Sequence, residues 1–269
     1  MKLIRELRIG PPKSFKTGAV VGTYPKPMLV FLFDSNGLTI IPSKKEPPMK
    51  GYIDIDIISD DLKEITFNDL ITYCKMPQDK LPKVTYIDFN KLNKSGMTFE
   101  ASPFPTDDAY RTFVDAVNFL VSIGCPWATY VFDSTTSFFD CMKSSMAKNQ
   151  AKTLEDARKW SPAIGGKVCQ HIGVLNKLKC HCVYLAHSHM EKNEISGDIS
   201  VLPLGPASFA EQAPGLVDNY IYQTMETGEA QVWTRPSGNV KAIGMRWPSR
   251  LPGKVGADFK SIYGKELGV

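Results

Sequence analysis

Long hydrophobic runs are missing from this sequence of 269 residues. None approaches the roughly 20 apolar residues that a helix needs to cross a bilayer. Residues 1–6 carry charges where a secretory signal would need an apolar stretch. We therefore expect an intracellular, cytoplasmic protein with no segment in a membrane.

Cysteine is sparse, and no two cysteines form a Cys-x-x-Cys pair, which argues against both a disulfide framework and a zinc ribbon. Cys180 and Cys182 lie near three histidines, but on a strand they would share one face while His181 points to the other. No second cysteine pair completes a tetrahedral zinc site. We expect reduced, mostly buried thiols at the six cysteines, which are Cys74, Cys125, Cys141, Cys169, Cys180 and Cys182.

Strong charge bias and internal repeats are absent as well. The net charge of +4 is too small to argue for a nucleic-acid partner by itself. Hydrophobic residues make up 43% and charged residues 22% of the chain, which is the composition of a folded protein and not of a disordered or fibrous one. The length is ordinary for one α/β domain, so we expect a single domain over residues 1–269.

The sequence does contain an alternation of strand-like and helix-like segments. Residues 3–9 indicate a strand, and residues 17–23 indicate a helix after a turn. Residues 28–33 and 127–132 are continuous apolar runs, as expected for strands buried on both faces of a parallel sheet. Apolar residues recur at helical spacing from Thr106 onward, which indicates an amphipathic helix between these strands. This order predicts βαβ units.

The other segments are less regular. Residues 42–105 contain two β-like runs, at 52–58 and 84–89, and are expected to be an elaboration on the core. A helical stripe after residue 166 leads into a strand at 181–186. From residue 219 onward, short alternating runs indicate antiparallel strands that extend the sheet. The predicted fold is therefore α/β, a mostly parallel sheet flanked by helices with antiparallel strands at the C-terminal end.

Residues 10–17 read Gly-Pro-Pro-Lys-Ser-Phe-Lys-Thr and match the phosphate-loop pattern G-x-x-x-x-G-K-[ST] except at the second glycine, where the chain has Phe15. Such a loop points backbone N–H groups at phosphate oxygens, while its lysine binds phosphate and its hydroxyl binds Mg²⁺. Lys16 and Thr17 supply these side chains, and a basic surface turn is the alternative interpretation. The predicted nucleotide-binding residues are Gly10, Pro11, Pro12, Lys13, Ser14, Phe15, Lys16 and Thr17.

A carboxylate further along the chain strengthens this interpretation. Asp133 follows the apolar run at 127–132, which is where phosphate-loop proteins hold Mg²⁺ through a carboxylate. Asp34 follows the apolar run at 28–33 in the same way. We therefore predict that Thr17 and Asp133 bind the Mg²⁺ that accompanies ATP.

Short motifs along the chain carry a family resemblance. They are residues 10–17, Tyr24-Pro-Lys-Pro, Leu-Val-Phe-Leu-Phe-Asp34, Tyr130-Val-Phe-Asp133-Ser134, Tyr184-Leu-Ala-His187, Thr234-Arg-Pro and Arg246-Trp-Pro-Ser-Arg250. In this order they resemble the RecA-like core ATPases carried by phages, a group that includes single-strand annealing recombinases. The resemblance covers most of the chain outside residues 42–105.

The resemblance implies a RecA-like P-loop NTPase core that binds ATP and Mg²⁺ and works in phage-type DNA recombination or single-strand annealing in the infected host cell. The implied partners are single-stranded DNA, further copies of the chain in a homo-oligomer, and a single-stranded-DNA-binding protein. It also implies that Lys16 binds phosphate and that His187 ends a strand beside the γ-phosphate as a polar sensor. From the residues alone, a His187 satisfied by the backbone is an equally good interpretation.

Two departures from the family pattern predict that ATP hydrolysis is slow. Phe15 adds bulk where the backbone approaches the phosphates, and Asn36 stands in place of the glutamate that activates water, although an amide cannot act as a general base. Asp34 is the candidate substitute for that base. A non-hydrolysing nucleotide-binding accessory of recombination or replication is the main alternative. A P-loop small-molecule kinase is a third hypothesis, and the lack of an arginine-rich lid argues against it.

Two polar segments correspond in order to the loops through which RecA-like proteins contact DNA. The first is the basic stretch at residues 143–159, and the second covers residues 189–198. The second is acidic enough that the first is the expected DNA contact. Two solvated loops are the alternative.

Cationic residues gather near the C-terminus, at Arg235, Lys241, Arg246 and Arg250. In RecA-like proteins this part of one subunit faces the nucleotide of its neighbour. The resemblance therefore implies that at least one of Lys241, Arg246 and Arg250 acts as a catalytic cation in trans on the neighbouring site. Arg246 and Arg250 are the candidates that flank Trp247. Solvated strand-end charges or salt-bridge partners are the alternative.

Overall fold

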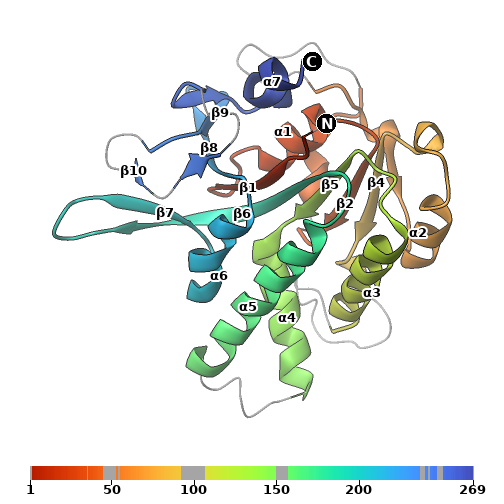
Figure 1. The fold of residues 1–269 in the computed structure, drawn as a ribbon, viewed down its shortest axis with the longest axis horizontal. Helices are drawn as coiled ribbons and strands as arrows, with labels where there is room; N and C mark the ends of the chain where they lie inside the picture. The colour runs from red at the N-terminus through yellow and green to blue at the C-terminus, as the bar shows by residue number, and fades with distance from the viewer. Residues whose placement is uncertain are drawn as a thin grey trace.

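The structure is a computed structural model that describes residues 2–34, 36–44, 53, 55–91, 107–149, 157–236, 240–241, 243–246 and 251–268. Its centre is an extended mixed β-sheet with helices on both faces (Figure 1). The strands lie in the order β12-β9-β8-β1-β6-β5-β2-β4-β3, and all pairs from β8 to β3 are parallel. The α/β class and the mostly parallel sheet predicted from the sequence are therefore confirmed.

The elements have the following bounds. The strands are β1 (Arg5–Gly10), β2 (Met28–Leu32), β3 (Leu62–Glu64), β4 (Val84–Asp88), β5 (Thr129–Asp133), β6 (His181–Lys192), β7 (Ile199–Pro203), β8 (Asn219–Glu226), β9 (Glu229–Trp233), β10 (Val240–Lys241), β11 (Gly244–Met245) and β12 (Lys254–Gly256). The α-helices are α1 (Lys16–Thr23), α2 (Phe67–Tyr73), α3 (Asp107–Ile123), α4 (Thr135–Asn149), α5 (Ala157–Leu175), α6 (Ala207–Gln212) and α7 (Lys265–Leu267). A short 3₁₀ helix, η1 (Gly37–Ile40), follows β2. None of the described helices is long and apolar enough to cross a membrane.

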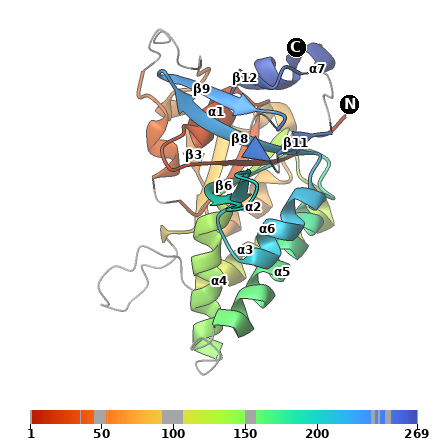
Figure 2. The ribbon, with the colours of Figure 1, turned by 90° about the vertical axis from the view of Figure 1, so that its left-hand side faces the viewer.

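The two faces of the sheet are covered by different helices. Helix α1 and the C-terminal segment around α7 lie on one face, and helices α3 to α6 lie on the other (Figure 2). Successive side chains of a strand point to opposite faces, so each strand contributes to both layers. Leu7 and Ile9 of β1 accordingly pack with α3 to α6, while Val183 and Leu185 of β6 pack with α1.

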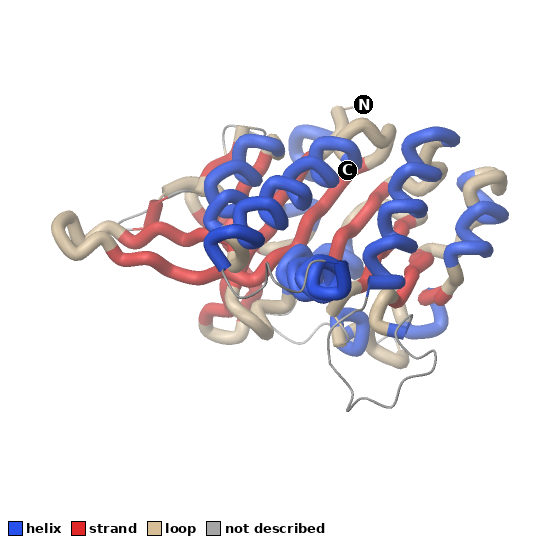
Figure 3. The backbone as a smooth tube through the Cα atoms, turned by 90° about the horizontal axis from the view of Figure 1, so that it is seen from below, coloured by secondary structure: helices blue, strands red, loops and turns tan. Residues whose placement is uncertain are grey.

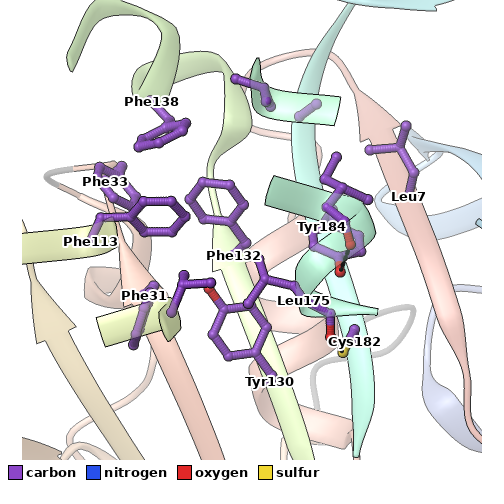
Figure 4. Packing of buried hydrophobic residues seen from close by; sticks show 14 of the residues in the cluster. Leu7, Phe31, Phe33, Phe113, Tyr130, Phe132, Phe138, Leu175, Cys182 and Tyr184 are labelled. Atoms are coloured by element: carbon purple, nitrogen blue, oxygen red, sulfur yellow. Dashed lines mark hydrogen bonds between the residues drawn. The ribbon is translucent and has the colours of Figure 1, made fainter. Parts of the chain in front are cut away.

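Aromatic rings fill the layer between the sheet and helices α3 and α4 (Figure 4). The ring of Phe113 on α3 stacks on that of Phe132 on β5, with 5.3 Å between centroids. Phe33, just after β2, and Phe138 on α4 complete the group, with centroids 5.7 and 4.5 Å from that of Phe113. Large buried rings of this kind contribute most of the packing energy of a core. These rings pack against the ends of β2 and β5. Asp133 is the last residue of β5, and Asp34 comes two residues after β2.

Residues 143–159 and 189–198 were both expected to be loops, and this prediction is wrong for most of their described residues. Helix α4 runs to Asn149 and α5 begins at Ala157. Strand β6 does not stop at residue 186 but continues to Lys192 and forms an antiparallel hairpin with β7. This hairpin projects from the body of the molecule (Figures 1 and 3). Only its tip, at residues 193–198, is a turn.

Two further details differ from the sequence prediction. The expected strand at 52–58 is not formed over residues 55–58, whereas β3 and β4 extend the parallel sheet beyond β2. Residues 52 and 54 lie outside the described part. At the other edge, β8 is parallel to β1, while β9, β11 and β12 join antiparallel to their neighbours. The C-terminal antiparallel strands are thus confirmed, with β8 as the parallel strand that attaches them.

His181 makes the stability of this fold depend on pH. Its side chain is 1% exposed, and its Nδ1 accepts a hydrogen bond from the Ile4 N–H at 3.1 Å. Burial lowers the pKa of His181 from 6.5 to about 4. Between pH 6.5 and 4 the histidine is therefore protonated in the unfolded chain but not in the folded one. The contribution of His181 to the free energy of unfolding is fully present above pH 6.5 and falls as the pH drops towards 4.

We expect His181→Asn to flatten this pH dependence, because the asparagine Oδ1 can accept from Ile4 but does not titrate. Between pH 7 and 5 the wild type should lose about 2 kcal/mol more of its free energy of unfolding than the variant. Urea unfolding at both pH values measures this difference. Other titrating groups are common to the two proteins, so equal losses would show that His181 is not the group responsible.

Candidate functional site

A cavity of about 270 Å³ opens where the loop between β1 and α1 meets the carboxyl ends of β2 and β5 and the middle of β6. In open α/β sheets ligands bind at this edge, outside the carboxyl ends of the strands. The residues that line the cavity are Lys13, Ser14, Phe15, Lys16, Thr17, Asp34, Asn36, Gly37, Thr39, Ile40, Asp133, Ser134 and His187. Residues from separate parts of the sequence prediction therefore meet in one place.

The loop backbone has the shape that binds anions. Lys13 and Phe15 have φ angles of 62° and 64°, in the left-handed region. Left-handed residues beside right-handed ones turn successive N–H groups inward and form an anion-binding nest. Phe15 thus adopts the conformation that a glycine at this position supplies freely. For a residue with a Cβ this conformation costs about 1–2 kcal/mol.

The ring of Phe15 lies over the first turn of α1. A Cβ on Gly18 would come within 2.6 Å of the ring, so the ring fits because residue 18 has no side chain. The ring also packs at the edge of the apolar core on the α1 face. Phe15 and Gly18 therefore fit each other, because the missing side chain at residue 18 leaves room for the ring.

Lys16 is folded back onto its own loop. Its Nζ donates to the carbonyl oxygens of Gly10 and Pro11, at 3.0 and 2.9 Å, and to Ser14 Oγ at 3.2 Å. The side chain is 8% exposed, and burial lowers the pKa of Lys16 to about 8, although Asp133 acts in the opposite direction. Phosphate oxygens are stronger acceptors for an ammonium group than neutral carbonyls. The arrangement leaves Lys16 ready to exchange these partners for a phosphate.

Thr17 and Asp133 meet directly. Thr17 Oγ1 donates to Asp133 Oδ2 at 2.7 Å, although the two residues lie 116 positions apart. Asp133 is 3% exposed, and burial raises its pKa to about 7, with the nearby Asp34 acting in the same direction. A divalent cation between the hydroxyl and the carboxylate would favour the charged form. The pair fits the hydroxyl and carboxylate that Mg²⁺ needs.

No cluster of three or more metal-binding side chains occurs among the described residues. Mg²⁺ does not require one, because it is usually held by one or two protein groups together with phosphate oxygens and water. Cys182 is buried in β6, and Cys180, directly before this strand, is buried as well.

Asp34 and Asn36 stand on the wall of the cavity opposite the phosphate loop. The Asn36 N–H donates to Asp34 Oδ1 at 3.2 Å. The segment can lie close to Asp133 because Gly37 has no side chain. A Cβ at this position would be only 2.7 Å from Asp133 Oδ2. The two residues therefore lie beside Asp133 in the lining of the cavity, and the role of Asp34 as a base stays a prediction.

His187 also lines the cavity, in register with Gly10 of β1. Its backbone N–H donates to Thr136 Oγ1 at 2.9 Å, whereas its buried Nδ1 has no hydrogen-bond partner among the described residues. Burial, and then the charge of Lys16, lower the pKa of His187, so the ring is neutral. The prediction that His187 ends its strand is wrong, because β6 continues into the hairpin. A neutral ring with a free nitrogen remains beside the phosphate loop.

The C-terminal cations lie elsewhere. Arg246 is exposed and directly follows β11, whose Met245 pairs with Asn219 at the start of β8. This end of the sheet is opposite to the cavity, which lies beyond Gly10 at the other end of β1. Lys241 belongs to β10, which pairs with β7. Arg250 lies outside the described residues, as does Trp247.

The sequence prediction missed residues that support the loop from behind. Gln223 on β8 is fully buried and donates from Nε2 to the Ser14 carbonyl at 2.6 Å. Arg8 on β1 donates to Gln223 Oε1 at 3.0 Å. Both strands carry several polar residues, so the sequence does not single out Arg8 and Gln223. Polar side chains of this kind are buried only when they have partners.

No protein-family model matches the chain, and comparison with curated proteins also finds no match.

Proposed function

We propose that the protein binds ATP with Mg²⁺ at residues 10–17. The observation that carries this proposal is the meeting of Lys16, Thr17 and Asp133 in one cavity, next to a loop with the backbone shape of an anion nest. In this assignment the loop and Lys16 hold the phosphates, while Thr17 and Asp133 hold the metal ion. The charge of the metal ion would balance that of the triphosphate.

The order of the strands supports a RecA-like core. Strand β6 pairs with β1 on one side and with β5 on the other, so that His187 stands between the phosphate loop and Asp133. A neutral histidine there can donate or accept a hydrogen bond at the γ-phosphate without adding charge. This is the geometry expected for a residue that senses the terminal phosphate.

We further propose that the chain hydrolyses ATP slowly and acts as a homo-oligomer on single-stranded DNA, in recombination or annealing. Hydrolysis needs a group that orients and activates water, and Asp34 is the carboxylate that lines the cavity besides Asp133. The alternative, a nucleotide-binding accessory that does not turn over, is supported by Asn36, which lines the same wall but cannot accept a proton.

Calorimetric titration with ATP and with a non-hydrolysable analogue, each with and without Mg²⁺, tests the proposal. We expect both nucleotides to bind, and to bind more weakly when Mg²⁺ is removed with a chelator. Phosphate release is then measured with and without single-stranded DNA. Slow release that DNA accelerates supports the enzyme, whereas binding without release supports the accessory. Absence of binding contradicts both.

A double variant should raise the slow rate of ATP hydrolysis that we expect for the wild type. We expect Phe15→Gly combined with Asn36→Glu to raise the rate of hydrolysis, because the pair frees the loop and introduces a base whose contribution is typically about 10²–10⁴-fold. The matched control is Phe15→Gly combined with Asn36→Gln, which has the same length but no base. Steady-state phosphate release compares the two. A wild-type rate of ATP hydrolysis that is already about 10 per second would show that neither Phe15 nor Asn36 limits catalysis.

A further inference from the structure

We infer that Gln223 is a positioning residue that aims the phosphate loop at the nucleotide. The inference rests on the proposed function, and it adds a residue from β8 that the phosphate-loop motif does not contain. Gln223 does not line the cavity. It acts on bound phosphate through the backbone of the loop.

The Gln223 side chain is held in a single orientation. Its Nε2 donates to the Ser14 carbonyl at 2.6 Å, and its Oε1 accepts from Arg8 Nη1 at 3.0 Å. A carbonyl can only accept and a guanidinium group can only donate, so the reversed amide would lose both bonds. The side chain is 0% exposed, and no bulk water can replace a lost partner.

Arg8 is itself fixed by the layer between β1 and the C-terminal segment. Its Nε donates to Glu6 at 2.7 Å, its Nη2 to Tyr24 Oη at 2.6 Å, and its Nη1 also to the Ala257 carbonyl at 2.9 Å. Tyr24 and Tyr263 both donate to the same Glu6 carboxylate. Glu6 and Arg8 are fully buried. A buried network with its partners satisfied is rigid, and this one ends at Gln223.

Fixing the Ser14 carbonyl also fixes the following N–H group. The carbonyl and the N–H of a trans peptide lie in one plane and point in opposite directions. Since the Ser14 carbonyl points to the Gln223 side chain, the N–H of Phe15 points away from it. Phe15 then turns into the left-handed region and Lys16 begins α1. Gln223 thus orients an N–H of the anion nest before the nucleotide arrives.

The contact between β8 and the loop is close at both ends. A Cβ on Gly10 would lie 2.3 Å from the Gln223 carbonyl oxygen and 2.8 Å from Ser14 Oγ. The Gln223 backbone therefore touches the residue that opens the loop, and its side chain touches the residue near the apex. The loop is therefore held against β8 at Gly10 and at Ser14.

The test is a comparison of Gln223→Glu with wild type in calorimetric titrations with ATP, ADP and inorganic pyrophosphate. The glutamate keeps the acceptor for Arg8 but sets an oxygen against the Ser14 carbonyl, which turns the peptide away. We expect all three ligands to bind about 10–100-fold more weakly, the range for losing a hydrogen bond to a charged group. The loss for pyrophosphate should equal that for ATP, because the contact is with phosphate.

Two further variants separate positioning from stability. Gln223→Met has a similar volume and no charge, so it replaces Gln223→Glu in the test if the glutamate variant does not fold. It should also weaken the binding of ATP, ADP and pyrophosphate. Ile221→Val is the control, because it removes one methyl group from the same buried face of β8 without touching the loop. It should lower thermal stability slightly and leave affinity unchanged.

The possible results distinguish the inference from the proposed function. If wild type binds ATP and the Gln223 variants bind it equally well, the inference is wrong while the nucleotide site stands. Equal losses in Ile221→Val would reduce Gln223 to a general contributor to stability and would also overturn the inference. If wild type binds neither ATP nor pyrophosphate, the proposed function fails.

Discussion

Replacing Lys16 with alanine is expected to abolish the binding of ATP·Mg²⁺. The Nζ atom of Lys16 sits at the centre of the phosphate loop, 2.9–3.2 Å from three of its oxygen atoms. It is the buried cation of the cavity, and hydrogen bonds to charged groups contribute about 1.5–3 kcal/mol each. An ammonium group that contacts two phosphates therefore accounts for a factor of about 100 or more in affinity. Calorimetry with ATP and Mg²⁺ measures the loss.

In this experiment the affinity for nucleotide should fall while the stability of the ligand-free protein changes little. Burial disfavours the charged form of Lys16, as its pKa of about 8 shows, so the ligand-free protein loses little when the ammonium is removed. Lys16→Met, which keeps the length of the side chain, should unfold at a temperature similar to wild type and still fail to bind nucleotide. Lys260→Ala, an exposed lysine on the C-terminal segment, is the control and should bind normally. Equal nucleotide affinity in wild type and Lys16→Ala would contradict the proposed site.

The sequence allowed prediction of those parts of the site whose residues lie in short, consecutive segments. Residues 10–17 carry their chemistry within eight consecutive positions, and Asp133 follows a strand whose apolar character is plain in the sequence. Parallel strands bring their carboxyl ends to one edge of a sheet, so the meeting of Thr17 and Asp133 followed from the order of the segments alone. Thr17 and Asp133 do lie within hydrogen-bonding distance of each other, while their role as ligands of Mg²⁺ stays a prediction.

Support from behind the loop could not be predicted in the same way. Gln223 and Ser14 lie 209 positions apart, and their contact depends on the register between β8 and β1. A shift of one residue would turn the Gln223 side chain to the other face of the sheet. Nothing in the local pattern fixes that register. It follows from the packing of the C-terminal segment on Glu6 and Arg8.

The segments read as loops were misjudged because tertiary packing outweighed local composition. Residues 143–149 are polar, yet they continue α4 because Phe138 and Met142 anchor the preceding turns in the core. Strand β6 leaves the sheet at His187 but is kept extended by its pairing with β7 up to Lys192. A strand needs only a neighbour with free backbone groups, whatever its side chains are. Neither partner could be recognised from the segment itself.

The last expected result concerns assembly. We predict that Arg246→Ala lowers ATP hydrolysis by a large factor while leaving ATP binding intact. Arg246 is exposed and lies at the end of the sheet opposite to the cavity, so it cannot reach the nucleotide of its own subunit. In a homo-oligomer that stacks this end on the cavity of the next subunit, its guanidinium group would stabilise charge on the γ-phosphoryl group, an effect worth about 10³–10⁵ in rate. A solvated surface charge would contribute about 1 kcal/mol or less.

Mixing two inactive variants distinguishes these alternatives. Arg246→Ala subunits keep Lys16 and bind ATP, and Lys16→Ala subunits keep Arg246 but bind none. If the arginine acts in trans, each preparation alone is inactive and the mixture recovers part of the wild-type rate, since a Lys16→Ala subunit supplies its arginine to a neighbour that holds ATP. Specific activity should also rise with protein concentration, and light scattering should show oligomers that depend on nucleotide. A protein that stays monomeric at micromolar concentration with ATP and single-stranded DNA, or a mixture as inactive as its components, would rule out this assembly, whereas the binding of ATP at the loop would be unaffected.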